Sequence, residues 1–124
     1  MATTLSSTFT LDTSSGVDPI NISIAPSWSV TEPTGSGAFA TAPGTITPML
    51  SMAGTSDYFV LVVNRGLPDG NKHGKVLLRS GQGSEIALLR YTDFAFIPLK
   101  AGVGLEALYD TALTSVEWFY WTRP

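Results

Sequence analysis

The sequence predicts an all-β fold, an antiparallel β-sandwich of jelly-roll-like or barrel-like form with little or no helix. Turn-forming residues recur about every 8–15 positions, as they do in sandwiches and barrels. Along several segments, apolar residues alternate with Ser and Thr, a pattern typical of strands with one buried face. In the first 56 residues, five prolines and five glycines are spaced too closely for a helix.

The first half is expected to contain three strands. Apolar residues alternate with Thr and Ser over residues 4–11, and they keep to even-numbered positions over residues 19–31. The run of turn residues at 32–37 predicts a loop, and Pro43-Gly44 predicts a turn. A short strand is expected around residues 45–50.

The second half has a stronger strand pattern. Residues 58–63 form a continuous run of β-branched and aromatic residues, which indicates a buried strand. The polar segment 64–74 predicts a turn, and residues 75–79 the returning strand. A turn at 81–83 then leads into a strand at 85–91.

Two later segments are less regular. Residues 94–99 contain Pro98, which indicates an edge strand or a bulge because proline lacks the N–H that a central strand uses. Residues 105–113 fit either a helix or a strand. The strand is favoured because residues 115–122 would then pair with it as a hairpin.

The composition indicates one domain over residues 1–124, with residues 1–15 as a candidate extended N-terminal arm. The 124 residues are 44% apolar and 14% charged, enough for a core without metal or disulfide staples, and no Cys is present. The first 56 residues contain no Lys or Arg. The N-terminus lacks the pattern of a secretory signal, so synthesis in a cytoplasm is expected. The longest apolar run is too short for a membrane helix.

The side-chain inventory predicts neither an enzyme nor a cofactor or metal site. The single histidine, His73, is the candidate general base, but it falls in an expected exposed turn. Asp69 and Asn71 in the same turn offer too few carboxylates for calcium. The glycines of the 81–83 turn lack the helix and lysine of a phosphate loop. Seven scattered cations argue against nucleic-acid binding. The scattered acidic residues leave open a catalytic carboxylate pair of the kind that hydrolyses glycosidic bonds. The candidates for this pair are Asp57, Glu85, Asp93, Glu106, Asp110 and Glu117.

The C-terminal strand carries large aromatic groups on both faces. In strand alternation, one face holds Val116, Trp118 and Tyr120, and the other holds Glu117, Phe119, Trp121 and Arg123. If the first set fills the core, Phe119, Trp121 and Arg123 become the candidate interface, although the faces could be reversed. A central strand covered on both sides is the alternative. Trp, Tyr and Arg are enriched at the centres of protein interfaces.

Four segments of the second half form a further pattern: Gly83-Ser-Glu-Ile-Ala-Leu-Leu89, Ala95-Phe-Ile-Pro-Leu-Lys-Ala-Gly102, Gly104-Leu-Glu-Ala-Leu-Tyr-Asp-Thr-Ala112 and Ser115-Val-Glu-Trp-Phe-Tyr-Trp-Thr-Arg123. In this pattern, about residues 57–124 resemble small structural proteins of tailed-bacteriophage virions. The resemblance implies a non-enzymatic sandwich that forms symmetric homo-oligomers, a trimer being one form, as a capsid decoration or tail component. The implied partners are further copies and other phage capsid or tail proteins. The implied location is the virion, after synthesis in the host bacterial cytoplasm, with no membrane or nucleic-acid contact.

A carbohydrate-binding sandwich is the alternative function. Trp28, Trp118 or Trp121 would then stack on the faces of sugar rings. Light scattering would reveal self-assembly, whereas tryptophan fluorescence with a glycan panel would reveal sugar stacking.

Overall fold

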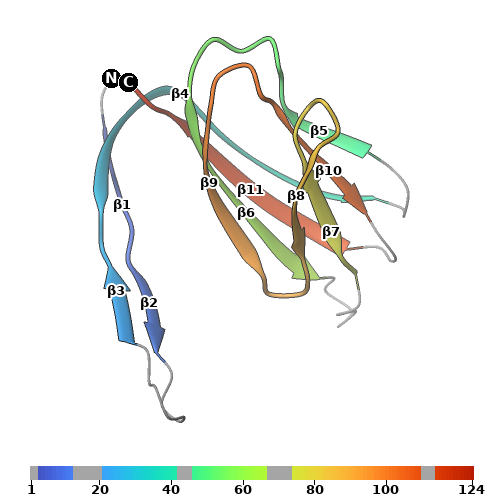
Figure 1. Ribbon diagram of the computed structural model, residues 1–124, viewed down its shortest axis with the longest axis horizontal. Helices are drawn as coiled ribbons and strands as arrows, with labels where there is room; N and C mark the ends of the chain where they lie inside the picture. The colour runs from blue at the N-terminus through green and yellow to red at the C-terminus, as the bar shows by residue number, and fades with distance from the viewer. Residues whose placement is uncertain (1–2, 13–20, 42–45, 67–73, 110–113) are drawn as a thin grey trace.

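A computed structural model describes residues 3–12, 21–41, 46–66, 74–109 and 114–124 of the protein. Within these ranges all regular secondary structure is β-strand, so the predicted all-β class is confirmed (Figure 1). The strands are β1 (Thr3–Ser6), β2 (Phe9–Asp12), β3 (Asn21–Ile24), β4 (Ser27–Thr41), β5 (Ile46–Leu50), β6 (Tyr58–Gly66), β7 (Val76–Arg79), β8 (Glu85–Leu89), β9 (Phe94–Leu99), β10 (Leu105–Tyr109) and β11 (Thr114–Thr122).

The eight strands from β4 to β11 pair in a nested order. The outermost pair is β4 with β11, followed by β5 with β10, β6 with β9 and β7 with β8, all antiparallel. This nesting produces two sheets, β4-β11-β6-β9 and β5-β10-β7-β8, which is the jelly-roll arrangement of a sandwich. β1 extends the first sheet beyond β4 to five strands. The sheets stay separate and open at their edges, so the jelly-roll-like form is adopted rather than the barrel-like one.

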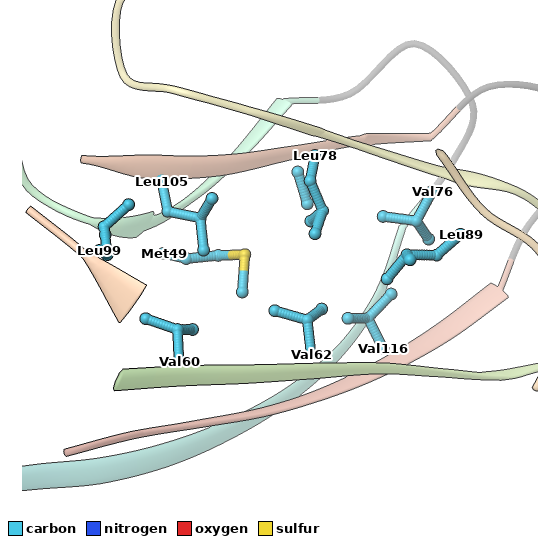
Figure 2. Close-up of a cluster of buried hydrophobic side chains, with 10 residues drawn as sticks. Met49, Val60, Val62, Val76, Leu78, Leu89, Leu99, Leu105 and Val116 are labelled. Carbon is cyan, nitrogen blue, oxygen red and sulfur yellow. The ribbon is translucent and has the colours of Figure 1, made fainter. Parts of the chain in front are cut away.

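The hydrophobic core fills the space between these two sheets. Val60, Val62 and Val116 project from the five-stranded sheet toward side chains of the four-stranded sheet (Figure 2). Their alternation with outward residues follows the period of two that the sequence shows. The opposing and flanking core residues are Met49, Val76, Leu78, Leu89, Leu99, Leu105 and Ala107.

The loop predicted at residues 32–37 is wrong, because β4 runs from Ser27 to Thr41, with a bulge between Thr31 and Thr34 in its pairing with β11. Gly35 and Gly37 lie opposite Tyr120 and Trp118 of β11, and the two rings cover the glycines. A Cβ atom on Gly35 would lie 2.5 Å from Tyr120 Cε1, and one on Gly37 would lie 2.6 Å from Trp118 Nε1. These glycines therefore admit aromatic rings against the strand instead of forming a turn.

Two predicted strands of the first half are each divided. The segment predicted at 4–11 breaks between β1 and β2, and the segment predicted at 19–31 breaks between β3 and β4. At these breaks the Ser7 N–H donates to the Pro26 carbonyl over 3.2 Å. Within the segment 1–15, β1 belongs to the large sheet, whereas β2 pairs only with β3 in a separate hairpin. This β2–β3 hairpin stands apart from the sandwich (Figure 1).

Most elements of the second half match their predictions. β5, β6, β7 and β8 correspond to the strands expected around 45–50 and at 58–63, 75–79 and 85–91, although β6 extends to Gly66 and β8 ends at Leu89. The expected return of 75–79 alongside 58–63 is wrong, because β7 pairs with β8 and β10 in one sheet, whereas β6 pairs with β9 and β11 in the other. The turn at 81–83 is closed by a bond from the Gly83 N–H to the Ser80 carbonyl. β9, which contains Pro98, lies at a sheet edge as expected. The strand interpretation of the segment from residue 105 is confirmed over Leu105–Tyr109. The predicted hairpin with residues 115–122 is wrong, because β10 pairs with β5 and β7 in one sheet and β11 pairs with β4 and β6 in the other. The Pro43-Gly44 turn lies outside the described residues.

One buried polar side chain joins the two sheets. Asn64 of β6 is fully buried, and its amide donates to the carbonyls of Gly74 and Leu89 over 2.9 and 3.0 Å. Its side-chain oxygen accepts from the Thr114 hydroxyl at 2.7 Å and from the Gly66 N–H at 3.0 Å. Both donor hydrogens and both acceptor positions of the amide are therefore used.

Replacement of this amide should destabilise the fold strongly. Asn64→Leu keeps a similar volume but leaves two carbonyls, one N–H and one hydroxyl without their partner, and we expect a loss of about 3–5 kcal/mol. Thr114→Val removes only one of the four bonds and should cost about 1 kcal/mol. Urea unfolding measures both free energies, and equal losses would contradict the central role of the amide.

The glycines beneath the aromatic rings should resist even one added methyl group. We expect Gly37→Ala to cost about 1–3 kcal/mol, because the Trp118 ring has to move away from the strand. Gly54→Ala is the matched control, since its nearest atom would be the Ser51 carbonyl oxygen at 3.5 Å, an ordinary contact. That control should change stability by less than about 0.5 kcal/mol. A neutral Gly37→Ala in thermal unfolding would contradict the close approach.

Candidate interaction surface

The C-terminal strand β11 is the centre of the candidate site. Val116 is fully buried in the core, and Trp118 and Tyr120 pack against the core with their rings stacked 5.6 Å apart. Phe119 and Trp121 alternate with these residues and therefore lie on the outer face of the sheet, where their rings are 6.3 Å apart. Arg123 follows the strand and is exposed. The structure thus has the first of the two orientations considered for this strand.

The outer face of the five-stranded sheet has an aromatic cluster of its own. The rings of Trp28 and Phe59 lie 4.7 Å apart, and Phe96 is 5.5 Å from each of them. The Arg123 guanidinium lies 4.5 Å from the centre of the Phe59 ring, within the range of a cation–π contact. Phe59 is consequently only 2% exposed, although it is on the side of the sheet away from the core.

An apolar groove of about 700 Å³ adjoins this cluster. It is lined by side chains of the β2–β3 hairpin and of the five-stranded sheet, including the rings of Phe9 and Phe94, which lie 6.2 Å apart. Phe9, Ile24 and Phe94 remain 42%, 50% and 52% exposed. Among the described residues, no charged side chain lines the groove, and the lining residues are Leu5, Ser6, Ser7, Thr8, Phe9, Ile24, Pro26, Trp28, Leu61, Phe94, Phe96, Pro98 and Trp121.

A second apolar surface lies on the outer face of the four-stranded sheet. Ile46, Leu108, Leu77 and Leu88 are register partners across its four strands, so their side chains share one face. Beside this row Arg79 donates through Nε to Glu106 Oε1 over 2.9 Å, and the ion pair is largely buried. Ile46 and Leu88 are nearly half exposed.

Three of the acids considered for a catalytic carboxylate pair are engaged by groups other than a second carboxylate. Glu106 pairs with Arg79, Glu117 pairs with Arg65, and Asp57 accepts a bond from the Ala101 N–H. Among the described residues, no three His, Asp or Glu side chains gather in a group that could hold a metal ion. His73, Asp69, Asn71 and Asp110 lie outside the described residues.

Sequence reasoning proposed Phe119, Trp121 and Arg123 as interface candidates and did not single out most of the residues that surround them. Phe59 and Leu61 belong to a continuous apolar run, in which the outward face cannot be recognised by alternation. Phe96 alternates with Ala95 and Ile97, which are also apolar, and Trp28 lies on β4, which β11 separates from β6 in the sheet. The pairing of Trp121 with Phe59, and of Phe119 with Leu61, brings these segments together.

No helix in the described part of the chain has the length and apolar character needed to cross a membrane. In comparisons with known proteins, no family model and no curated sequence matches the chain.

Proposed function

We propose that the chain is a non-enzymatic structural protein of a tailed-bacteriophage virion, which assembles as a homo-oligomer on the capsid or tail. The homo-oligomer is proposed because an apolar, aromatic groove, with no charge among its described lining residues, lies on the outside of a sandwich whose core is formed between the two sheets. Exposed apolar surface of this kind is typical of protein interaction sites. The virion part is supported by the resemblance of residues 57–124, which include the aromatic C-terminal strand.

The arrangement of β11 supports an interface at Phe119, Trp121 and Arg123. Trp121 lines the groove, Phe119 stacks against it, and Arg123 is held over the buried Phe59 ring. A large aromatic side chain that its own strand holds in place loses little conformational freedom on association. These three residues are therefore the expected contacts with a further copy or with another capsid or tail protein.

The fold by itself does not choose between assembly and sugar binding, since jelly rolls serve both as viral capsid domains and as lectins. The groove favours assembly. Among the described residues, the hydroxyl-bearing side chains of its lining are Ser6, Ser7 and Thr8, and a sugar requires several polar groups around the aromatic platform. Trp118 packs toward the core, and the Trp28 ring is already stacked against Phe96.

Two tryptophan variants test the interface. Trp121→Ala should stay folded and weaken self-association by about 2 kcal/mol or more, because an aromatic contact at the interface is lost. Trp118→Ala should instead lower the stability of the monomer by about 3–5 kcal/mol, because it leaves a void beside the core. Melting temperature and the oligomer mass from light scattering distinguish the two effects.

The oligomer mass of the wild type can contradict the proposed self-assembly. A chain that remains monomeric at its highest soluble concentration, with an unchanged mass in both variants, is not a self-assembling protein. A change in tryptophan fluorescence with a member of a glycan panel, absent in Trp121→Ala, would then favour the carbohydrate-binding alternative.

The virion assignment has its own test in the gene neighbourhood. We expect genes for capsid, portal or tail proteins beside the coding gene, because structural genes of tailed phages are clustered. A neighbourhood of metabolic genes with no phage genes would contradict the virion assignment and leave the assembly proposal standing.

A further inference from the structure

We propose that the groove is filled by the β2–β3 hairpin of a second copy, so that two copies insert their hairpins into each other's grooves. In this exchange each copy's own Phe9 and Ile24 remain part of its groove lining. This inference rests on the proposed self-assembly and deepens it, because it names the segment that makes the contact and the surface that receives it. The hairpin consists of Phe9–Asp12 paired with Asn21–Ile24.

The hairpin lacks the support that a two-stranded element needs. It pairs with neither of the two larger sheets, and it stands apart from the sandwich (Figure 1). A two-stranded hairpin is at best marginally stable in water unless an apolar surface covers one of its faces. The ring contact between Phe9 and Phe94 links it to its own sheet, and both rings remain about half exposed.

The groove and the hairpin match in chemistry. Phe9 and Ile24 are register partners, so their side chains share one face of the hairpin, and both line the groove. Neither Phe9 nor Ile24 is charged, and no charged side chain is found among the described residues of the lining. The exposed Phe9–Ile24 face can therefore enter the groove of another copy without removing a charge from water. Burial of such surface is the main favourable contribution to association.

The attachment of the hairpin permits the exchange. Two short segments outside the strands, Ser7–Thr8 and Ala25–Pro26, join it to β1 and β4, and the Ser7 N–H to Pro26 carbonyl bond spans this joint. Exchange of an identical element between copies creates the same contacts in each direction, which closes a symmetric oligomer. Each copy then both donates a hairpin and receives one.

Cross-linking between two marked chains tests the exchange directly. The chain has no cysteine, so Phe9→Cys and Phe94→Cys each introduce a single thiol. The two variants, one of them lengthened by a tag, are co-expressed and treated with a short bismaleimide. We expect a product that contains both chains joined through positions 9 and 94. A double variant that carries both cysteines reports the link within one chain. If it forms only this intrachain link, and the mixture of single variants forms no link between chains, the exchange is overturned.

Charged substitutions in the full-length chain provide the second measurement. Phe9→Asp and Ile24→Asp should each weaken self-association at least roughly 30-fold, the effect of losing an interface hot spot. Ile86→Asp is the matched control, because Ile86 is 45% exposed on the other sheet, away from the groove. Circular dichroism confirms that the sandwich remains folded in each variant.

The outcomes separate the two proposals. An oligomeric wild type whose mass is unchanged by Phe9→Asp and Ile24→Asp overturns the exchange and leaves the proposed self-assembly intact. A wild type that stays monomeric at its highest soluble concentration overturns both.

Discussion

Asn64 fixes how the two sheets lie relative to each other. Between sheets, apolar packing is non-directional, so by itself it sets the spacing of the layers more firmly than their alignment. The Asn64 amide binds carbonyls that flank β7 and β8 in one sheet, while its oxygen receives Thr114 at the start of β11 in the other. A fully satisfied buried polar group of this kind selects one arrangement, because any shift leaves several groups without partners.

The second constraint is the central position of β11. It is paired on one side with β4 and on the other with β6, so its alternate residues reach both the core and the outer face. Two large rings fit on the core side only because Gly35 and Gly37 leave room for them on the neighbouring strand. A single strand thereby supplies the inner wall of the sandwich and the aromatic surface on its outside.

The outer face explains why self-assembly is the favoured function. The core between the sheets is complete without any of the outward aromatic residues. Trp28, Phe59 and Phe96 nevertheless form a packed cluster on the outside, with an open apolar groove and an unsupported hairpin beside it. Apolar surface that stays exposed to water does not stabilise a monomer, whereas an assembly of identical copies can bury it.

Local patterns in the sequence were enough to predict the all-β class, most strands of the second half and which residues share each face of β11, although not which face is the core. These features follow from the alternation of side chains along one strand, which needs no knowledge of its neighbours. The nested strand pairing, the partners of Asn64 and the groove were decided only by the tertiary structure. The glycines of β4 show the reason most clearly. Gly35 and Gly37 belong to a segment with the composition of a turn, but they lie in a strand. The rings of Tyr120 and Trp118 pack over them from β11, at the far end of the chain. Contacts between residues so distant in sequence leave no trace in the local pattern of either segment.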